Sequence, residues 1–135
     1  MYKQLGLTDL IAAIKQQIEA NTDLVCYDVP PENAPSPLVY AEIAGLKPDD
    51  TKTMYCKLYT VWIHVIAEEI PSSVPIHKHI QAVQEAMTDD ITLPEGFGLV
   101  YQMDNGIQAI KTDETGEKHA ILEFEFKISF AYKIK

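Results

Sequence analysis

The sequence predicts an α+β fold in which two helices pack on one face of a mostly antiparallel sheet of about five to six strands. One long segment alternates apolar and polar residues, and a second is rich in β-branched and aromatic residues. Both patterns are typical of half-buried strands. Two other segments place apolar residues at helical spacing. Short polar connections separate them, so neighbouring strands should run antiparallel. The expected order of elements is α-β-β-β-α-β-β-β, in a single domain of 135 residues.

The clearest strand lies at the end of the chain, between Lys118 and Lys135. Every even-numbered position from Ala120 to Ile134 is apolar, whereas most odd-numbered positions are polar. At about 3.3 Å per residue, a strand of roughly 15 residues extends about 50 Å. This length exceeds the diameter of roughly 35 to 40 Å expected for a compact domain of this size. Because Met54–Ala67 is nearly as long and similar in composition, we expect the two strands to pair and part of the ribbon to project.

The chain begins with an amphipathic helix at Leu7–Ala20, for which Thr8 is the expected N-cap. A short strand is predicted at Leu24–Val29. Residues 30–37 contain four prolines, which cannot continue a hydrogen-bonded ladder, so an ordered or extended surface connection is expected there. The apolar stripe of the helix comprises Leu7, Leu10, Ile11, Ile14 and Ile18.

The next strand is predicted at Leu38–Ala44, ahead of the long strand that begins at Met54. The nine residues between them, 45–53, are polar and rich in turn-forming residues. If the two strands are neighbours, this segment is the mobile tip of a hairpin. Loops of this length in small domains often carry function, although a solvated connector is an equally good interpretation.

A second helix is predicted from Ser72 to the region of Thr88. Either Ser72 or Ser73 can cap its N-terminus, and Pro75 is tolerated in the first turn. The helix therefore begins with favourable residues for its position. Its apolar stripe comprises Ile76, Ile80, Val83 and Met87.

Two further strands are predicted at Phe97–Met103 and Ile107–Lys111, on either side of Asp104-Asn105-Gly106. Both residues of an Asn-Gly pair accept a positive φ, which makes the pair the strongest local signal for a tight hairpin. A polar turn at residues 112–116 then leads to the terminal strand. These segments complete a sheet of consecutive antiparallel strands.

The composition argues against nucleic acid and membrane partners. The chain has a formal net charge of -9 and contains no arginine, whereas phosphate contacts require clustered Lys and Arg. No apolar run approaches the roughly 18 residues that a membrane span requires. The N-terminal residues also lack the apolar core of a signal peptide. We therefore expect a soluble protein that remains inside the cell that makes it.

The histidines and cysteines do not predict a metal centre. His77 and His79 are two residues apart on a helix, so their side chains point about 200° apart. His64 and His119 lie on the two long strands and can approach each other, with Cys56 on the same face as His64. Because a zinc site needs three or four convergent ligands, we expect no metal.

Other chemical motifs are likewise absent from the sequence. There is no Gly-x-Ser-x-Gly and no phosphate-cradling glycine pattern followed by a helix. The acidic pairs fall in turns or on polar faces, where solvated charges are the default. Cys26 and Cys56 lie within apolar strand patterns and are expected to be buried and free. The sequence therefore predicts no catalytic residue and no cofactor.

The order and spacing of the segments resemble those of a known family. The features are an amphipathic first helix, a proline-rich connection ending in Pro-Leu-Val-Tyr, a strand containing Val-Trp-Ile-His-Val-Ile, a capped helix and an alternating terminal strand. Together they resemble the tail terminator proteins, also called tail completion or head-to-tail joining proteins, of long-tailed bacteriophages and prophages. The similarity covers nearly the whole chain and is carried by apolar patterns.

The resemblance implies a hexameric ring of α+β subunits that caps the finished tail tube. The partners it implies are the tail tube protein and the head connector or neck protein. Assembly would take place in the cytoplasm of the bacterial host, and the ring would remain in the virion tail. Family loops next to the long strands mediate ring and tube contacts. The corresponding candidate interface residues here are Lys47, Asp49, Asp50, Thr51, Lys52, Asp113 and Glu114.

The sequence is also compatible with three other interpretations. The chain is small and acidic, as other neck and head-completion proteins are. It could instead be a monomeric domain that binds a small ligand between sheet and helices, or an enzyme in which His64, Cys56 and His119 meet in a cleft. The expected lining of the ligand pocket is Tyr55, Tyr59, Trp62 and Phe126.

Overall fold

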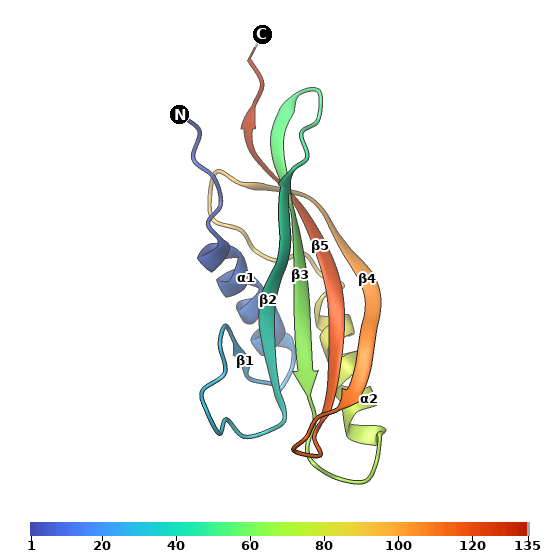
Figure 1. Cartoon of the computed structure of the whole chain (residues 1–135). Helices are drawn as coiled ribbons and strands as arrows, with labels where there is room; N and C mark the ends of the chain where they lie inside the picture. Colours follow the sequence, from blue (N-terminus) through green and yellow to red (C-terminus); the bar gives the residue numbers. More distant parts are fainter. Residues whose placement is uncertain (135) are drawn as a thin grey trace.

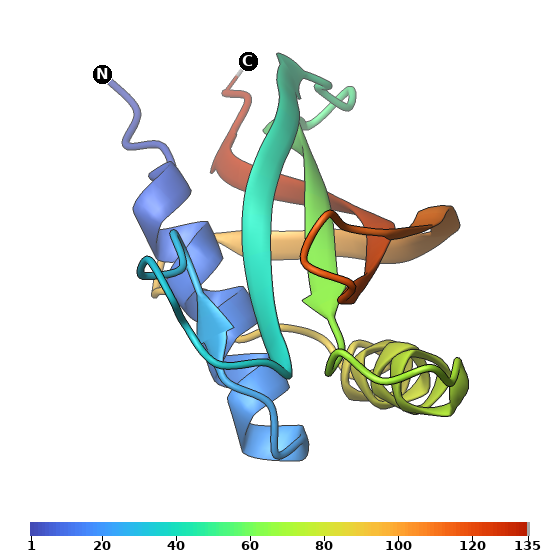
Figure 2. The ribbon, with the colours of Figure 1, turned by 60° about the horizontal axis from the view of Figure 1, so that its bottom comes forward.

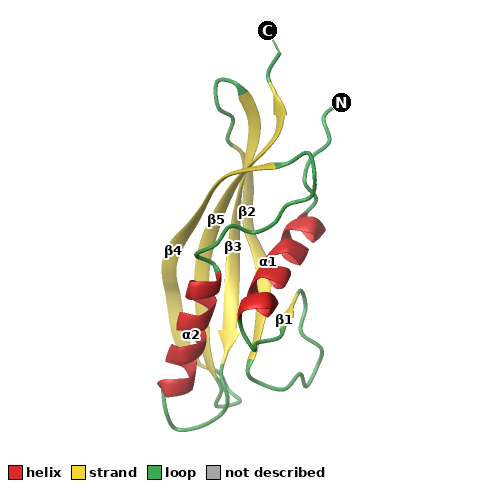
Figure 3. Cartoon of the chain, turned by 180° about the vertical axis from the view of Figure 1, so that it is seen from behind, coloured by secondary structure: helices red, strands yellow, loops and turns green. Residues whose placement is uncertain are grey.

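The computed structural model describes residues 1–134, which form two helices and five strands (Figure 1). Figure 3 shows that both helices cover the same face of the sheet. The predicted α+β class, with a mostly antiparallel sheet, is confirmed. Within these residues, neither helix is long and apolar enough to cross a membrane. The elements are α1 (Leu7–Asn21), β1 (Cys26–Tyr27), β2 (Leu38–Pro48), β3 (Met54–Ile66), α2 (Val74–Ala86), β4 (Gly98–Thr112) and β5 (Lys118–Tyr132).

The sheet has the strand order β1-β2-β3-β5-β4, which places β3 and β5 inside it. Neighbouring strands are antiparallel except β1 and β2, which are parallel. β3 and β5 pair along their length, from Met54 opposite Tyr132 to Ile66 opposite His119. The predicted pairing of the two long strands is therefore confirmed.

The core lies between the sheet and the two helices. The even-numbered residues of β5 from Ala120 to Ile128 are buried, as the period-two pattern predicts. The predicted stripe of α2 is fully buried, and that of α1 is buried apart from Leu7, which lies near its N-terminus. Burying each large apolar side chain stabilises the fold by about 1.5–3 kcal/mol. The largest fully buried side chains are Tyr59, Phe124 and Phe126.

The predicted hairpin at Asn105-Gly106 is wrong. Both residues lie inside the single strand β4, so the chain has one strand fewer than the predicted order. Gly106 does adopt the positive φ that the sequence indicates, at 91°. A β-bulge accommodates it, because the pairing with β5 shifts by one residue between Asp104 and Gly106. The Gly106 N–H also donates to Oδ1 of Asp104 at 2.7 Å.

Two strand boundaries differ from the prediction. The strand expected at 24–29 is reduced to the two residues of β1, which pair only with Val39 and Tyr40. β2 continues past Ala44 to Pro48, because β3 supplies partners as far as Lys57.

The N-cap of α1 and the end of the terminal strand also differ, whereas the N-cap of α2 is one of the two predicted serines. Gly6, and not Thr8, is the N-cap of α1, and no side chain caps it. Ser73 is the N-cap of α2 without a side-chain hydrogen bond, although the Val74 N–H donates to Oγ of Ser72 at 3.2 Å. β5 ends at Tyr132. The predicted end of this strand, Lys135, lies outside the described residues.

Part of the sheet projects beyond the helices, as the strand lengths predict. Figure 1 shows the β2–β3 hairpin and the last residues of β5 extending past the body at the end where both termini lie. Here Pro48 pairs with Lys57, and Met54 pairs with Tyr132. Figure 2 shows the strong twist of the sheet, with β2 and β4 crossing at a large angle. We call residues 47–57 and 128–133 the projecting ribbon.

Candidate assembly interface

Hydrogen bonds within the β2–β3 hairpin fix the shape of its tip. Oγ1 of Thr51 accepts hydrogen bonds from the backbone N–H groups of Thr53 and Met54, at 3.3 and 3.0 Å. Oδ1 of Asp50 accepts one from the N–H of Cys56 at 2.9 Å. Short polar side chains commonly stabilise turns in this way. The side chains of the tip therefore satisfy its own backbone.

Two lysines attach the tip to β5 and its C-terminal extension. Nζ of Lys133 donates to the carbonyl oxygen of Thr51 at 2.7 Å and lies 3.9 Å from Oδ2 of Asp50. Nζ of Lys127 lies 3.3 Å from Oδ2 of Asp49. The ends of β3 and β5 are therefore connected through the tip as well as through the sheet.

These contacts correct the predicted mobile loop of nine residues. Because β2 continues to Pro48, only the residues 49–53 connect the strands, and they form an ordered turn. Lys47 belongs to β2, where it pairs with Leu58. The side chains available to a partner on this surface are the exposed Lys47, Asp50 and Lys52 and the half-buried Asp49 and Thr51.

Asp113 and Glu114 lie in the turn between β4 and β5. The N–H of Asp113 donates to the carbonyl oxygen of Glu117 at 2.8 Å, and its own carbonyl accepts from the N–H of Gly116 at 2.9 Å. Gly116 has a φ of 87°, a conformation that favours glycine. This turn and the hairpin tip lie at opposite ends of the sheet (Figure 1). The structure therefore does not bring the two groups of candidate residues together.

A chain of four polar side chains crosses the sheet on the face that the helices do not cover. Oε1 of Glu42 lies 2.7 Å from Nε2 of His64, and Nδ1 of His64 lies 2.8 Å from Nε2 of His119. Nδ1 of His119 lies 3.1 Å from Oδ2 of Asp113. The predicted approach of the two histidines is confirmed. The two carboxylates at the ends of the chain were not predicted, because they come from β2 and the β4–β5 turn.

Burial lowers the pKa of His119 below its ordinary value, because desolvation disfavours the imidazolium. The carboxylate of Asp113 opposes this shift, and His64 adds to it. The ring of Tyr40 stacks on His64 with centroids 4.2 Å apart, and burial raises the pKa of Tyr40. The pair of imidazoles therefore lies between two carboxylates and beneath an aromatic ring.

The structure does not bring Cys56 to the histidine pair. Cys56 pairs with Ser129 near one end of β3, whereas His64 pairs with Ile121 near the other. Their separation of eight residues corresponds to about 26 Å along a strand. The interpretation that Cys56, His64 and His119 meet in a cleft is therefore wrong. Among residues 1–134, no group of three or more side chains is placed to hold a metal ion.

The predicted ligand pocket is also not formed by the expected residues. Tyr59 and Phe126 are buried in the core. Trp62 lies on the other face of the sheet, where its Nε1 donates to Oε1 of Glu123 at 3.1 Å. Tyr55 lies in the projecting ribbon. These four side chains lie on different faces or ends of the sheet and cannot line one cavity.

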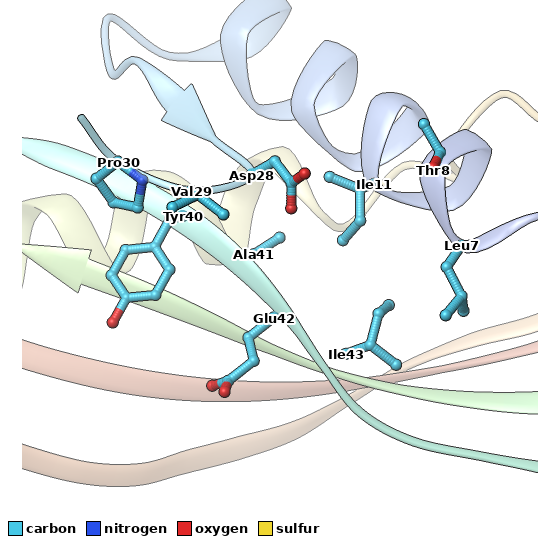
Figure 4. Close-up of a pocket in the computed structure, with 10 residues that line it drawn as sticks. All are labelled: Leu7, Thr8, Ile11, Asp28, Val29, Pro30, Tyr40, Ala41, Glu42 and Ile43. Atoms are coloured by element: carbon cyan, nitrogen blue, oxygen red, sulfur yellow. The ribbon is translucent and has the colours of Figure 1, made fainter.

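A pocket of about 390 Å³ lies instead at the edge of β2, beside the start of α1 (Figure 4). Ile11 on α1 and Asp28 after β1 line one part of it, and Ile43 and Glu42 line its β2 side (Figure 4). No local pattern predicts this pocket, because it exists only where β1 stops after two residues. We call it the β2-edge pocket. Its lining includes Leu7, Ile11, Asp28, Val29, Glu42 and Ile43.

These features define a class of protein: a small α+β subunit whose distinctive surfaces are a projecting ribbon, exposed turns and strand edges suited to contacts with other proteins. Its whole length, residues 1–135, matches the profile of a family described as "Putative tail termination protein". The chain therefore belongs to this family of phage tail terminators and is a structural protein of phage tails.

A solved structure shows the same fold. The chain is similar to one in "Virion of native gene transfer agent (GTA) particle", with a TM-score of 0.74 and 20% sequence identity. The alignment covers 90% of this chain and 96% of that one. No curated protein sequence shows significant similarity to the chain. The shared fold over nearly the full length of both chains agrees with the family assignment.

Proposed function

We propose that the chain caps the finished tail tube as a hexameric ring and joins the tail to the head connector. The observation that carries this proposal is the match of all residues, 1–135, to the tail termination family. The projecting ribbon supports it, because strand ends beyond the core give neighbouring subunits a surface to complete. In this proposal the ring assembles in the cytoplasm of the bacterial host and stays in the virion tail.

The two groups of candidate interface residues suggest how one subunit contacts two partners. Because they lie at opposite ends of the long strands, one group can face the tail tube while the other faces the head. We assign the tube contact to Lys47, Asp49, Asp50, Thr51 and Lys52 in the projecting ribbon. We assign the connector contact to Asp113 and Glu114 in the β4–β5 turn.

The charge of the chain fits a channel through which DNA passes. The formal net charge is -9, and Glu42, Glu123 and Glu125 lie on the face of the sheet that the helices leave open. Carboxylates that line a channel repel the phosphate backbone and so prevent adhesion. In the proposed ring, this open face points toward the lumen.

The mass of the native particle over a concentration series tests the ring. Six chains of 15.2 kDa would give a particle of about 91 kDa by light scattering behind a sizing column. Negative-stain images of this species should show a closed ring. If the free chain stays monomeric, it is mixed with tail tubes assembled from the tube protein of the same phage, and the tubes are imaged by negative stain.

The outcome separates the proposal from its nearest alternative. Density at one end of each tail tube, with rings at no other position, would support the tail terminator role. Binding to the head connector without any binding to tubes would instead identify a neck or head-completion protein. A chain that forms no ring alone, on tubes or on connectors would contradict the proposal.

A further inference from the structure

The sheet has two uncovered edges, one on each side. β1 pairs only with Val39 and Tyr40, so no strand within residues 1–134 pairs with β2 on that side from Ala41 to Pro48. On the opposite side, β4 pairs with β5 alone in the described sheet. Long strand edges present unpaired backbone groups, and proteins usually cover or charge them. Both edges of this sheet are therefore available for contact with another protein chain.

The β4 edge is apolar along much of its length. Three register shifts against β5 give this strand extra residues, so it is too irregular to extend the sheet as an uninterrupted ladder. Contacts through its side chains would dominate. The exposed apolar residues are Val100, Met103, Ile107 and Ile110.

We propose that the β4 edge of one copy docks into the β2-edge pocket of the next copy, and that this contact closes the ring. The inference rests on the proposed ring and identifies the surfaces that build it. The pocket supplies apolar partners in Leu7, Ile11, Val29 and Ile43. Two different surfaces of the same chain make a heterologous contact, and such contacts generate rings when the rotation closes.

The registers of the sheet align the two edges. Ile107 pairs with Leu122, Leu122 with Ile63, and Ile63 with Ala41, so Ile107 and Ala41 lie at the same level of the sheet. A rotation about an axis roughly parallel to β3 and β5, the two strands inside the sheet, preserves this level. It brings Ile107 of one copy to the pocket beside Ala41 of the next. β2 and β4 run in opposite directions and the twist of the sheet makes them cross at a large angle, so the facing edges meet as crossed strands that contact each other through side chains.

The charges of the two edges are complementary. Lys111 is exposed near the end of β4, level with the first residues of β2. Asp28 and Glu42 line the β2-edge pocket three to four residues further along β2, because Asp28 follows Tyr27, the partner of Tyr40, and Glu42 pairs with Trp62. Opposite charges at the rim of an interface favour one register and exclude others. In the proposed contact, the long side chain of Lys111 of one copy extends along β2 toward Asp28, the nearer carboxylate of the pocket of the next.

The first test replaces one apolar side chain on the β4 edge. Ile107→Lys places a charge against the pocket, and the concentration at which rings dissociate should rise at least about tenfold. Ile70→Lys is the matched control, because Ile70 is 43% exposed and Ile107 46% exposed, and Ile70 lies on neither edge. The control should form rings as the wild type does. Thermal unfolding of both variants below the ring-forming concentration verifies that the subunit itself is folded.

A charge exchange tests the register independently. Lys111→Glu and Asp28→Lys should each weaken the ring, whereas the double variant should restore it. Both side chains are exposed, so the subunit fold should tolerate each change. Absence of rescue in the double variant would overturn the proposed register.

Cross-linking tests the contact itself, either in free rings or on tail tubes. Gln108→Cys on the β4 edge and Val29→Cys at the pocket are combined in one chain and treated with a short bis-maleimide. The native Cys26 and Cys56 are buried and should not react. A ladder of covalent multimers from the double variant, with no dimer from either single variant, is expected. A dimer from Gln108→Cys alone would indicate paired β4 edges and overturn the proposal.

The two proposals fail in different ways. If Ile107→Lys forms rings as stable as those of the wild type, the proposed edge contact is overturned and the proposed ring function is unaffected. A wild-type chain that forms no ring, either alone or on tubes, would overturn both.

Discussion

Nδ1 of His64 lies 2.8 Å from Nε2 of His119, and both side chains are buried on the face of the sheet away from the helices. One of the two nitrogens donates and the other accepts, so a single proton lies between the rings. The carboxylate of Glu42 lies within hydrogen-bond distance of Nε2 of His64, and that of Asp113 within hydrogen-bond distance of Nδ1 of His119. Charging both imidazoles would remove the hydrogen bond and place two positive charges in contact.

Acidification should therefore lower the free energy of unfolding. The folded protein holds the pKa of His119 below 6.5, mainly through burial. Because the unfolded chain then binds more protons than the folded one, stability falls as the pH drops below 6.5 and through the lowered pKa. Urea unfolding at intervals between about pH 7.5 and about pH 5 measures the loss.

Replacing the histidine should remove this part of the pH dependence. His119→Asn is expected to flatten the dependence of stability on pH over that interval, whatever its effect on stability at neutral pH. His77→Asn is the control, because His77 is exposed on α2 and lies outside the chain of hydrogen bonds. Identical pH profiles for His119→Asn and the wild type would show that the buried pair does not control acid stability.

Lys133 should hold the hairpin tip against β5. Lys133→Met removes the 2.7 Å hydrogen bond to the Thr51 carbonyl oxygen. It also removes the positive charge that lies 3.9 Å from Oδ2 of Asp50. We expect a loss of about 0.5–1.5 kcal/mol in the free energy of unfolding, with faster amide hydrogen exchange at Thr53 and Met54. Lys52→Met, at an exposed position of the same turn, should change neither. Unchanged exchange in Lys133→Met would mean that the bonds within the turn suffice to order it.

Gly106 should be required for the bulge in β4. Its φ of 91° is costly for a residue with a side chain, so Gly106→Ala is expected to destabilise the fold by about 1–2 kcal/mol. The cause would be the backbone alone, because a Cβ at this position would meet nothing within 4 Å. Gly45→Ala is the control: its added Cβ would make an ordinary contact, 3.6 Å from Thr60, without a positive φ. Equal stabilities of the two variants in urea unfolding would contradict this account.

The sequence predicts those parts of the fold whose signal is local. The alternation in β5 and the apolar stripe of α2 each lie within one continuous segment, and both match the buried faces. Asn105-Gly106 shows the limit of such signals. The pair indicates a positive φ, which either a turn or a bulge can use, and the choice depends on whether β5 is long enough to pair along the whole of β4.

The candidate site required information that no local pattern contains. The polar segment that begins at Gly45 predicts a loop at Lys47, whereas pairing with β3 extends β2 beyond this residue. The β2-edge pocket depends on β1 ending after two residues, and the carboxylates beside the histidines come from distant segments. Long-range pairing, and not residue preference, decides each of these features.

The tip of the projecting ribbon should bind the tail tube partly through its positive charges. Lys47 and Lys52 are exposed, and neither is needed for the hydrogen bonds that order the turn. Lys47→Glu and Lys52→Glu should each weaken binding to tail tubes by about two- to tenfold at low salt, with smaller effects at high salt. Sedimentation of the chain with tubes measures the affinity.

Glu114→Lys provides the matched reversal at the opposite end of the sheet. Glu114 is exposed in the β4–β5 turn, so its substitution should leave tube binding unchanged and alter binding to the head connector. Because surface charge reversals rarely perturb folding by more than about 0.5 kcal/mol, a difference between the three variants would reflect the contact itself. If Glu114→Lys weakened tube binding while the two lysine variants did not, the ends of the subunit would be assigned the wrong way round. The ring would then sit on the tube with its β4–β5 turns facing the tail.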